Sequence, residues 1–199
     1  MKSAIAQETD MTIGKLIKPT LVLAASSLVS GAVLASGITP QKMADAIFAV
    51  IESDRTVYTR NVVDRLQNKE EVLDASEHWK EEQALPLPAQ MLRMGSERVN
   101  EKDSGFTYSL LSLWAINKQN KPKTPLEEKA LKVIEKDPSK NFYGEETLAG
   151  KKYFTAVYAD VAVSEACVKC HNKHIDSPRT DFKLNDVMGG IAIRIPLDD

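Results

Sequence analysis

The spacing of hydrophobic and polar positions predicts a long helix near the start of the folded part of the chain. Thr39-Pro40 is an N-cap followed by proline at the first helical position. Behind it, apolar residues recur at helical spacing as far as about Asn68: Met43, Ile47, Val50, Ile51, Tyr58, Val62 and Leu66. The polar stretch that follows is expected to be mostly loop. Pro88 then opens a second predicted helix of sequence AQMLRMGSERV.

From Gly105 onward the pattern changes to alternation, which is typical of strands. It predicts one strand ending near Trp114, two more over 142–147 and 152–163, and a last one over 190–196. Between the first two, Thr124-Pro125-Leu126-Glu127 has the form of a capping box and predicts a short helix to about Lys136. A long helix followed by strands with helices between them indicates one α+β domain with an antiparallel sheet.

The first 35 residues have the form of a secretory signal. Lys15 and Lys18 precede an apolar run from Leu21 to Ala35 that ends in small residues. We expect cleavage after Ala35, which leaves residues 36–199 as the mature domain in the periplasm. The run is short for a spanning helix and contains serines and a glycine, but an uncleaved N-terminal anchor stays open as the alternative.

Composition narrows the class of protein. Of 199 residues, 43% are hydrophobic and 27% are charged, which is ordinary for a globular domain. The formal net charge of −2 gives no indication of a nucleic-acid partner, for which a clustered basic excess is expected. The only two cysteines lie three residues apart, so a small secreted fold held together by disulfides is excluded.

These cysteines belong to the sequence Cys167-Val168-Lys169-Cys170-His171, which has the form of the haem c attachment signature. On one helical turn, positions i, i+3 and i+4 share a face. Both sulfurs then reach the two vinyl groups at one edge of a porphyrin, and the imidazole turns beneath the ring toward the iron. We therefore predict one covalently bound haem c, attached at Cys167 and Cys170, with His171 as an axial ligand of the iron.

Two other kinds of site use the same residue types. A zinc site would need four ligands, which Cys167, Cys170, His171 and His174 supply only in a cramped arrangement. A thioredoxin-like redox pair would use the two cysteines alone. The export signal and the histidine directly after the second cysteine favour haem c over both.

The segments around this motif resemble a family of PAS-like domains that carry a single c-type haem. Members of that family form periplasmic sensor regions of bacterial signalling proteins or stand alone as small haem proteins. The likeness covers about Arg55 to Pro196. It rests, in chain order, on Arg55, Tyr58, Thr59, Asn61-Val62-Val63, Leu85-Pro86-Leu87-Pro88-Ala89, Ser112-Leu113-Trp114, Asn117, Asn120, Leu126-Glu127, Cys167, Cys170, His171-Asn172, Ser177-Pro178-Arg179, Asp186-Val187 and Gly189.

The resemblance implies a PAS-like fold in which a long N-terminal helix packs on an antiparallel sheet and haem c lies between sheet and helices. It also implies a haem sensor module, with no kinase or receptor domain following it in this sequence. The chain departs from the family at Ala115, where the family has proline, and at Phe182, where it has tryptophan. Met188 replaces a family arginine, which puts in doubt any propionate contact by that residue.

The second axial ligand determines what the haem does, because a protein ligand favours electron transfer and an open position favours gas binding. Met91 and Met94 share a face of the predicted Pro88 helix, and we predict Met91 as the ligand, with Met94 next. Methionine often fills a core instead, so an empty or water-filled position stays open. His174 lies too close to His171 to reach the opposite face of the ring, and is expected to be exposed or near a propionate. Met43, Met188 and His78 are further candidates, and Arg55 and Tyr58 are candidates for the pocket wall.

The expected function is that of a periplasmic cytochrome c acting as a redox- or diatomic-gas-responsive module. It would work through an unidentified redox or signalling protein, with nitric oxide or carbon monoxide as candidate ligands. The alternative is a simple electron-transfer cytochrome that shuttles electrons between redox partners. No arrangement of distal acid–base residues indicates a haem enzyme, so we expect no catalytic activity. Contact with a membrane is expected only if the signal segment is uncleaved.

Overall fold

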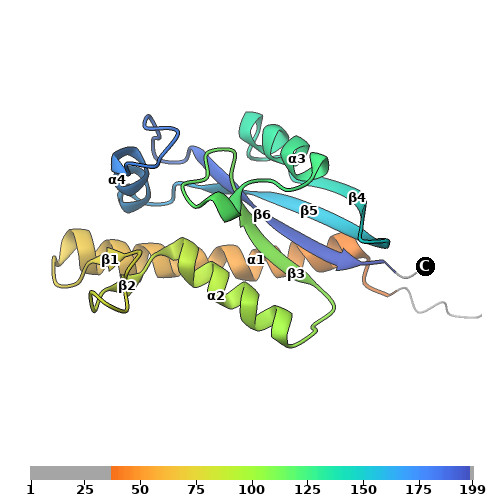
Figure 1. The fold of residues 1–199 in the computed structure, drawn as a ribbon, viewed down its shortest axis with the longest axis horizontal. Coiled ribbons are helices and arrows are strands. Elements are labelled where there is room, and N and C mark those ends of the chain that lie inside the picture. The colour runs from red at the N-terminus through yellow and green to blue at the C-terminus, as the bar shows by residue number, and fades with distance from the viewer. Residues whose placement is uncertain (1–36, 198–199) are drawn as a thin grey trace, which may run out of the picture. The chain divides into compact units, whose positions relative to one another are not determined.

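The computed structural model describes residues 37–197, and the predicted signal segment lies outside them. Helix α1 (Pro40–Val57) continues into a π-helical segment, η1 (Tyr58–Lys69), so the predicted long helix is confirmed (Figure 1). Its start is fixed by Thr39, whose hydroxyl accepts a hydrogen bond from the Lys42 N–H at 3.2 Å. The change to π winding has no signal in the hydrophobic spacing.

Three further helices and one 3-10 turn follow along the chain. They are α2 (Pro88–Glu101), η2 (Lys118–Asn120), α3 (Pro125–Lys136) and α4 (Glu165–Lys173). The predicted capping box of α3 is present, because Thr124 Oγ1 accepts from the Glu127 N–H and the Glu127 carboxylate accepts from the Thr124 N–H, each at 3.1 Å. Helix α4 carries both cysteines and the adjacent histidine.

The sheet contains all four predicted strands: β3 (Thr107–Leu111), β4 (Phe142–Leu148), β5 (Lys151–Val161) and β6 (Val187–Pro196). Their order is β3-β6-β5-β4, and every neighbouring pair is antiparallel. The polar stretch expected to be loop also contains β1 (Ala75–Ser76), which pairs in parallel with β2 (Leu85–Pro86). The pairing of β5 with β6 is irregular between Asp160 and Val161, close to the start of α4.

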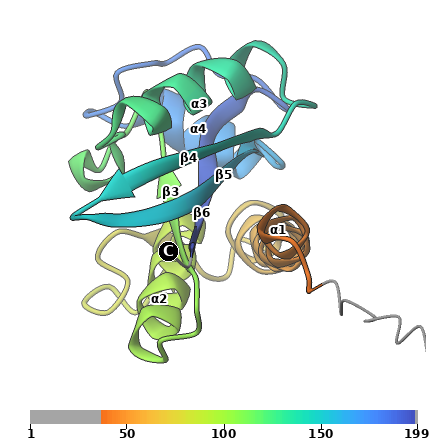
Figure 2. The same cartoon turned by 90° about the vertical axis from the view of Figure 1, so that its right-hand side faces the viewer.

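Helices cover both faces of the sheet. Helix α3 lies on one face, and α1 and α2 lie on the other (Figure 2). Alternating strand residues therefore enter two cores. The core on the α3 side includes Leu111, Ala130, Leu131, Ile134, Val157 and Ala192, and the core on the α1 side includes Ala44, Leu92, Ala156, Tyr158, Ile191 and Ile193. The predicted α+β class, with a long N-terminal helix and an antiparallel sheet, is confirmed.

A shared carboxylate attaches α1 to the sheet. The hydroxyls of Tyr143 and Tyr158 both donate to Asp45 Oδ1, at 2.7 and 2.8 Å, and the Phe48 ring stacks on the Tyr158 ring with centroids 4.1 Å apart. Burial and the neighbouring Asp45 carboxylate raise the pKa of Tyr158 well above its usual range. This attachment holds the helix across the sheet and so sets the position of η1.

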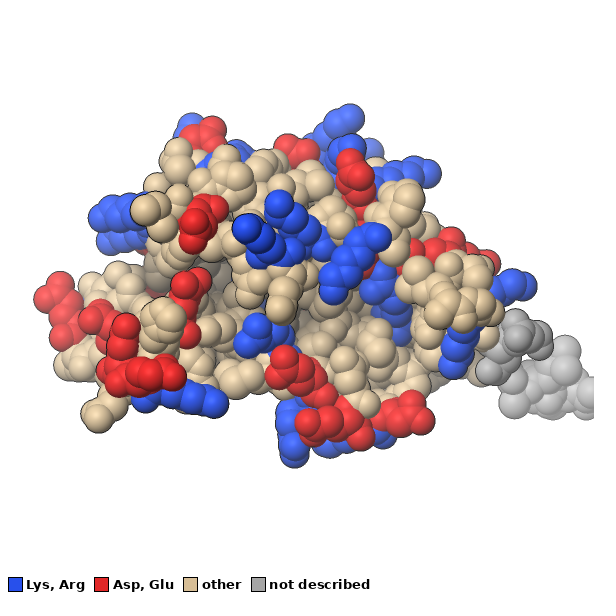
Figure 3. Space-filling model, viewed as in Figure 1, with Lys and Arg blue, Asp and Glu red and all other residues tan. Residues whose placement is uncertain are grey.

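The surface of the domain carries charges of both signs. On the face drawn in Figure 3, lysine and arginine side chains are interspersed with aspartate and glutamate, and acidic side chains gather near the β1–β2 segment. Within residues 37–197, no helix combines the length and the hydrophobicity that a membrane span requires.

Candidate functional site

A cavity of about 800 Å³ lies among α4, the α1–η1 helix, α2 and β3. Its volume is within the range of about 300–1,000 Å³ that is usual for sites of small molecules and cofactors. Cys167, Cys170 and His171 all line it. The three residues that the sequence assigns to haem c therefore face one common space.

Helix α4 brings these three side chains together. It begins after Ser164, whose hydroxyl accepts from the Ala166 N–H at 3.0 Å, and it ends before His174. Positions 167, 170 and 171 are i, i+3 and i+4 on this helix, so they share the face that the motif requires. The predicted grouping rests on one helical turn and depends little on the rest of the fold.

Both thiols have raised pKa values in this fold. Burial raises the pKa of Cys167, against the opposing effect of the Arg55 charge. Burial also raises the pKa of Cys170, and the nearby Glu77 and Cys167 raise it further. Redox-active thiols have lowered pKa values instead. Within residues 37–197, no three histidine, cysteine or acidic side chains are grouped as a metal ion requires, so the zinc alternative gains no support.

Burial favours the neutral form of the His171 imidazole. Its pKa is lowered chiefly by burial, and Arg55 and His174 lower it further while Asp160 opposes them. Neutral imidazole is the form that binds metal ions. The Nδ1 atom is buried and has no hydrogen-bond partner among the described residues, so no such bond orients the ring through that atom.

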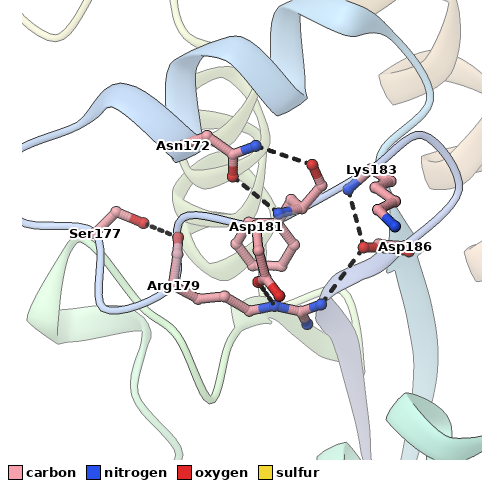
Figure 4. A network of polar contacts seen from close by, with 7 residues as sticks. Asn172, Ser177, Arg179, Asp181, Lys183 and Asp186 are labelled. Carbon is pink, nitrogen blue, oxygen red and sulfur yellow. Dashed lines mark hydrogen bonds and ion pairs between the residues drawn. The ribbon is translucent and has the colours of Figure 1, made fainter.

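The ring of Phe182 lies edge-on against the ring of His171, with centroids 5.8 Å apart and an interplanar angle of 88°. The backbone of Phe182 is itself fixed by the residue next to His171. Asn172 Nδ2 donates to Phe182 O at 2.9 Å, and Asn172 Oδ1 accepts from the Phe182 N–H at 3.0 Å (Figure 4). Asn172 thus ties the loop after α4 back to α4 itself.

Arg179 completes this arrangement. Its guanidinium lies 4.7 Å from the Trp114 ring centroid and 4.4 Å from the Phe182 centroid. Ion pairs with Asp181 at 2.7 Å and Asp186 at 3.4 Å hold it there (Figure 4). The loop residues that resemble the PAS-like family therefore build a support for His171.

An ion pair lies on the wall formed by α1 and β5. Arg55 Nε and Nη2 donate to the two carboxylate oxygens of Asp160 at 2.8 and 2.7 Å. Burial acts against the charge of Arg55, but Asp160 outweighs it and raises the pKa of Arg55. The third nitrogen, Nη1, is buried and has no hydrogen-bond partner among the described residues.

The structure separates the other predicted ligand candidates. Met91 and Met94 are partly buried on α2, but neither lines the cavity, so the cavity gives the Met91 prediction no support and it stays a prediction. Met43 packs against the core on the α1 side, and His78 is exposed. The two candidates that do line the cavity are Met188 and His174.

His174 is expected from the sequence to be exposed or near a propionate, and it is partly buried at the cavity wall. Its Nε2 lies 3.6 Å from Glu77, and its Nδ1 accepts from the Asp176 N–H at 3.1 Å. Of the two pocket candidates on the long helix, Arg55 lines the cavity. Tyr58 is not among the lining residues and donates instead to the Pro86 carbonyl at 2.7 Å.

Sequence reasoning missed Asp160 and the supporting role of Arg179 and Phe182. Asp160 has a local signal, because it is a charged residue near the end of an otherwise apolar strand, where a carboxylate needs a partner. The two rings that enclose Arg179, Trp114 and Phe182, are 68 residues apart, and no local pattern brings them together.

Comparison with known proteins agrees with this fold. A solved structure, described as the crystal structure of the cyanobacterial heme-protein Tll0287, superposes with a TM-score of 0.51 at 13% sequence identity, covering 81% of this chain and 98% of that one. No curated protein matches the chain. The model of the Tll0287-like family matches residues 38–196, nearly the whole described domain, and this protein therefore belongs to the Tll0287-like family.

Proposed function

We propose that this protein is a single-haem c-type cytochrome that responds through its haem to redox state or to a small ligand. One observation carries the proposal: Cys167, Cys170 and His171 line the same cavity of about 800 Å³ from a single helical turn. The structurally similar Tll0287 is described as a heme-protein, which adds support from outside this chain.

The residues of this chain fit that cofactor. Burial raises the pKa of both thiols and lowers the pKa of the imidazole, whose buried Nδ1 has no hydrogen-bond partner within residues 37–197. Each thiol would add across one vinyl group, so that S–C replaces S–H and the hydrogen passes to the other vinyl carbon without an oxidant. His171 would bind the iron, and the bound haem would supply reversible one-electron chemistry and an axial position for a ligand.

The sequence also supports a proposal for the cellular location and the partner of the protein. We propose that the chain is exported to the periplasm with cleavage near Ala35, since cytochromes of this type mature outside the cytoplasm and the first residues have the form of a signal. A redox or signalling protein is the proposed partner, and the proposed role is binding and response, without catalysis.

Covalent attachment is the first testable prediction. After expression with export and haem attachment, denatured wild-type protein should keep haem-linked peroxidase staining on a gel. The variant with Cys167→Ala and Cys170→Ala should lose it, because no other cysteine is present. Lys169→Ala, an exposed change inside the same motif, is the matched control and should keep the stain. Intact, colourless wild-type protein with stoichiometric zinc would contradict the proposal.

A further inference from the structure

The arginine–aspartate pair on the cavity wall has an unusual feature. Arg55 and Asp160 are joined by two parallel hydrogen bonds, and their side chains are only 15% and 11% exposed. A guanidinium has one more terminal nitrogen than such a pair uses. In Arg55 that nitrogen, Nη1, is buried without a partner among residues 37–197, and such groups in native proteins call for an explanation.

The pair places a guanidinium and a carboxylate beside the residues proposed to carry haem. Arg55 and Asp160 act electrostatically on both Cys167 and His171 with opposite signs, and on His171 the effect of Asp160 is the larger. Arg55, Asp160, Cys167 and His171 all line the cavity. Since Asp160 engages one edge of the guanidinium, the orientation of Arg55 is determined and its remaining donors are directed by the protein.

Two walls of the cavity offer no side chain that binds haem iron. The α1–η1 helix contributes Arg55, Thr59, Val63 and Gln67, and α2 contributes no methionine, histidine or cysteine. Met188 is 7% exposed in a cluster with Phe182 and Trp114, the same rings that support His171. His174 follows His171 by three residues and is paired with Glu77.

We infer that the iron position opposite His171 is open to a small anion from solution, and that the guanidinium of Arg55, which lines the cavity, donates a hydrogen bond to that anion. This inference rests on the proposed haem. A hydrogen bond donated by a guanidinium is stronger to a ligand that carries negative charge than to a neutral one, even where Asp160 balances the charge of Arg55. Asp160 acts as the positioning residue, because its two hydrogen bonds hold the guanidinium in one orientation. The class of ligand is thus a small anion that binds ferric iron.

Cyanide binding to the oxidised, haem-loaded protein tests this inference. The variant with Arg55→Met and Asp160→Asn removes both charges together, because removing Arg55 alone would leave a buried carboxylate without its partner. We expect the dissociation constant for cyanide, measured from the Soret band, to rise about tenfold or more with the loss of a charge-assisted hydrogen bond. The affinity of the reduced protein for carbon monoxide, which is neutral, should change by less than about threefold.

Arg65→Met is the matched control, since Arg65 lies on the same long helix, is 54% exposed at its side chain and does not line the cavity. It should leave the cyanide affinity unchanged. The inference is overturned if the double variant binds haem and binds cyanide as tightly as the wild type, if Arg65→Met has the same effect, or if wild-type protein with covalent haem binds no cyanide. Absence of covalent haem from the wild type is a separate outcome, which contradicts the proposed function itself.

Discussion

The orientation of the His171 ring depends on packing. Its Nδ1 has no hydrogen-bond partner in the described part of the chain. The ring of Phe182, which is only 2% exposed, lies edge-on against the His171 ring. Asn172 fixes the backbone of Phe182 from one side, and Arg179 covers its ring from another. An imidazole that binds a metal usually has its second nitrogen hydrogen-bonded, so here an aromatic contact takes over part of that orienting role.

Phe182→Ala should therefore have two separable effects. The free energy of unfolding should fall by about 3–5 kcal/mol, because a buried ring is lost and a cavity remains. The absorption spectrum of the haem-loaded protein should also change, because His171 loses its neighbour. Urea denaturation followed by fluorescence measures the first effect, and visible spectroscopy measures the second.

Phe154→Ala provides the comparison. Phe154 packs at the edge of the core on the α1 side and does not line the cavity. It should lower stability without changing the spectrum. An unaltered spectrum in Phe182→Ala would show that the ring of Phe182 has no part in holding His171.

At the scale of residues, a site can be predicted from the sequence when its members lie within one helical turn. Cys167, Cys170 and His171 share a face as soon as α4 forms, so their grouping in the cavity follows from local spacing. The choice of Met91 depended on which face α2 presents to the cavity. That face is set by tertiary packing, which the spacing of two methionines does not determine.

Among the elements, the long α1–η1 helix contacts both the sheet and the cavity. Its first half packs on the sheet through Asp45 and Phe48, and its π-helical second half reaches α4 and carries Thr59 to the cavity wall. Segments of π winding often mark functional sites. The attachment at Asp45 therefore contributes to the stability of the fold and also helps to position the cavity wall that η1 forms.

Asp45→Ala should destabilise the protein by about 1–3 kcal/mol, because the buried hydroxyl of Tyr158 loses its acceptor. Hydrogen exchange of the α1 amides should become faster, as the helix loses its attachment to the sheet. Glu52→Ala is the control on the same helix, since the partner of Glu52 is Thr56 within α1. If α1 exchanges no faster in Asp45→Ala than in Glu52→Ala, the carboxylate is not what attaches the helix.

Helices and strands can be predicted from the sequence where the repeat of apolar positions continues over most of their length. Alternation placed all four strands of the main sheet, and the Thr124 capping box placed the start of α3. The pairing of β1 with β2 was missed, because each has only two residues and lies among polar neighbours. The change to π winding was missed because η1 has only four apolar residues, Tyr58, Val62, Val63 and Leu66, which are too few to reveal its period.

In the molecule as a whole, a buried set of charges joins α3 to the sheet. Arg194 of β6 pairs with Glu127 of α3 and with Glu146 of β4, the latter at 3.0 Å. Burial would raise the pKa of Glu146, but hydrogen bonds from Thr124, Thr155 and Arg194 outweigh it and lower the pKa from its ordinary value of 4.5. The folded state therefore holds this carboxylate ionised more strongly than the unfolded state does.

The stability of the fold depends on pH through the carboxyl group of Glu146. A carboxyl group with a lowered pKa stabilises the fold above pH 4.5, and this contribution is lost as the pH falls from there toward the folded value. We expect the urea concentration at the midpoint of wild-type unfolding to fall as the pH is lowered below about 4.5. In Glu146→Gln this concentration should fall less steeply with pH. Glu135→Gln, an exposed change on α3, should keep the wild-type slope. Equal slopes in all three proteins would exclude Glu146 as a source of acid sensitivity.

The position of β6 has a consequence for how the molecule is made. This strand is the last along the chain, yet it lies between β3 and β5 in the sheet (Figure 1). During synthesis, the sheet lacks its middle until residue 196 has emerged. The two cysteines emerge earlier, so they spend time in a chain whose core is unfinished. The proposed haem attachment would have that interval available, before the walls of the cavity have come together.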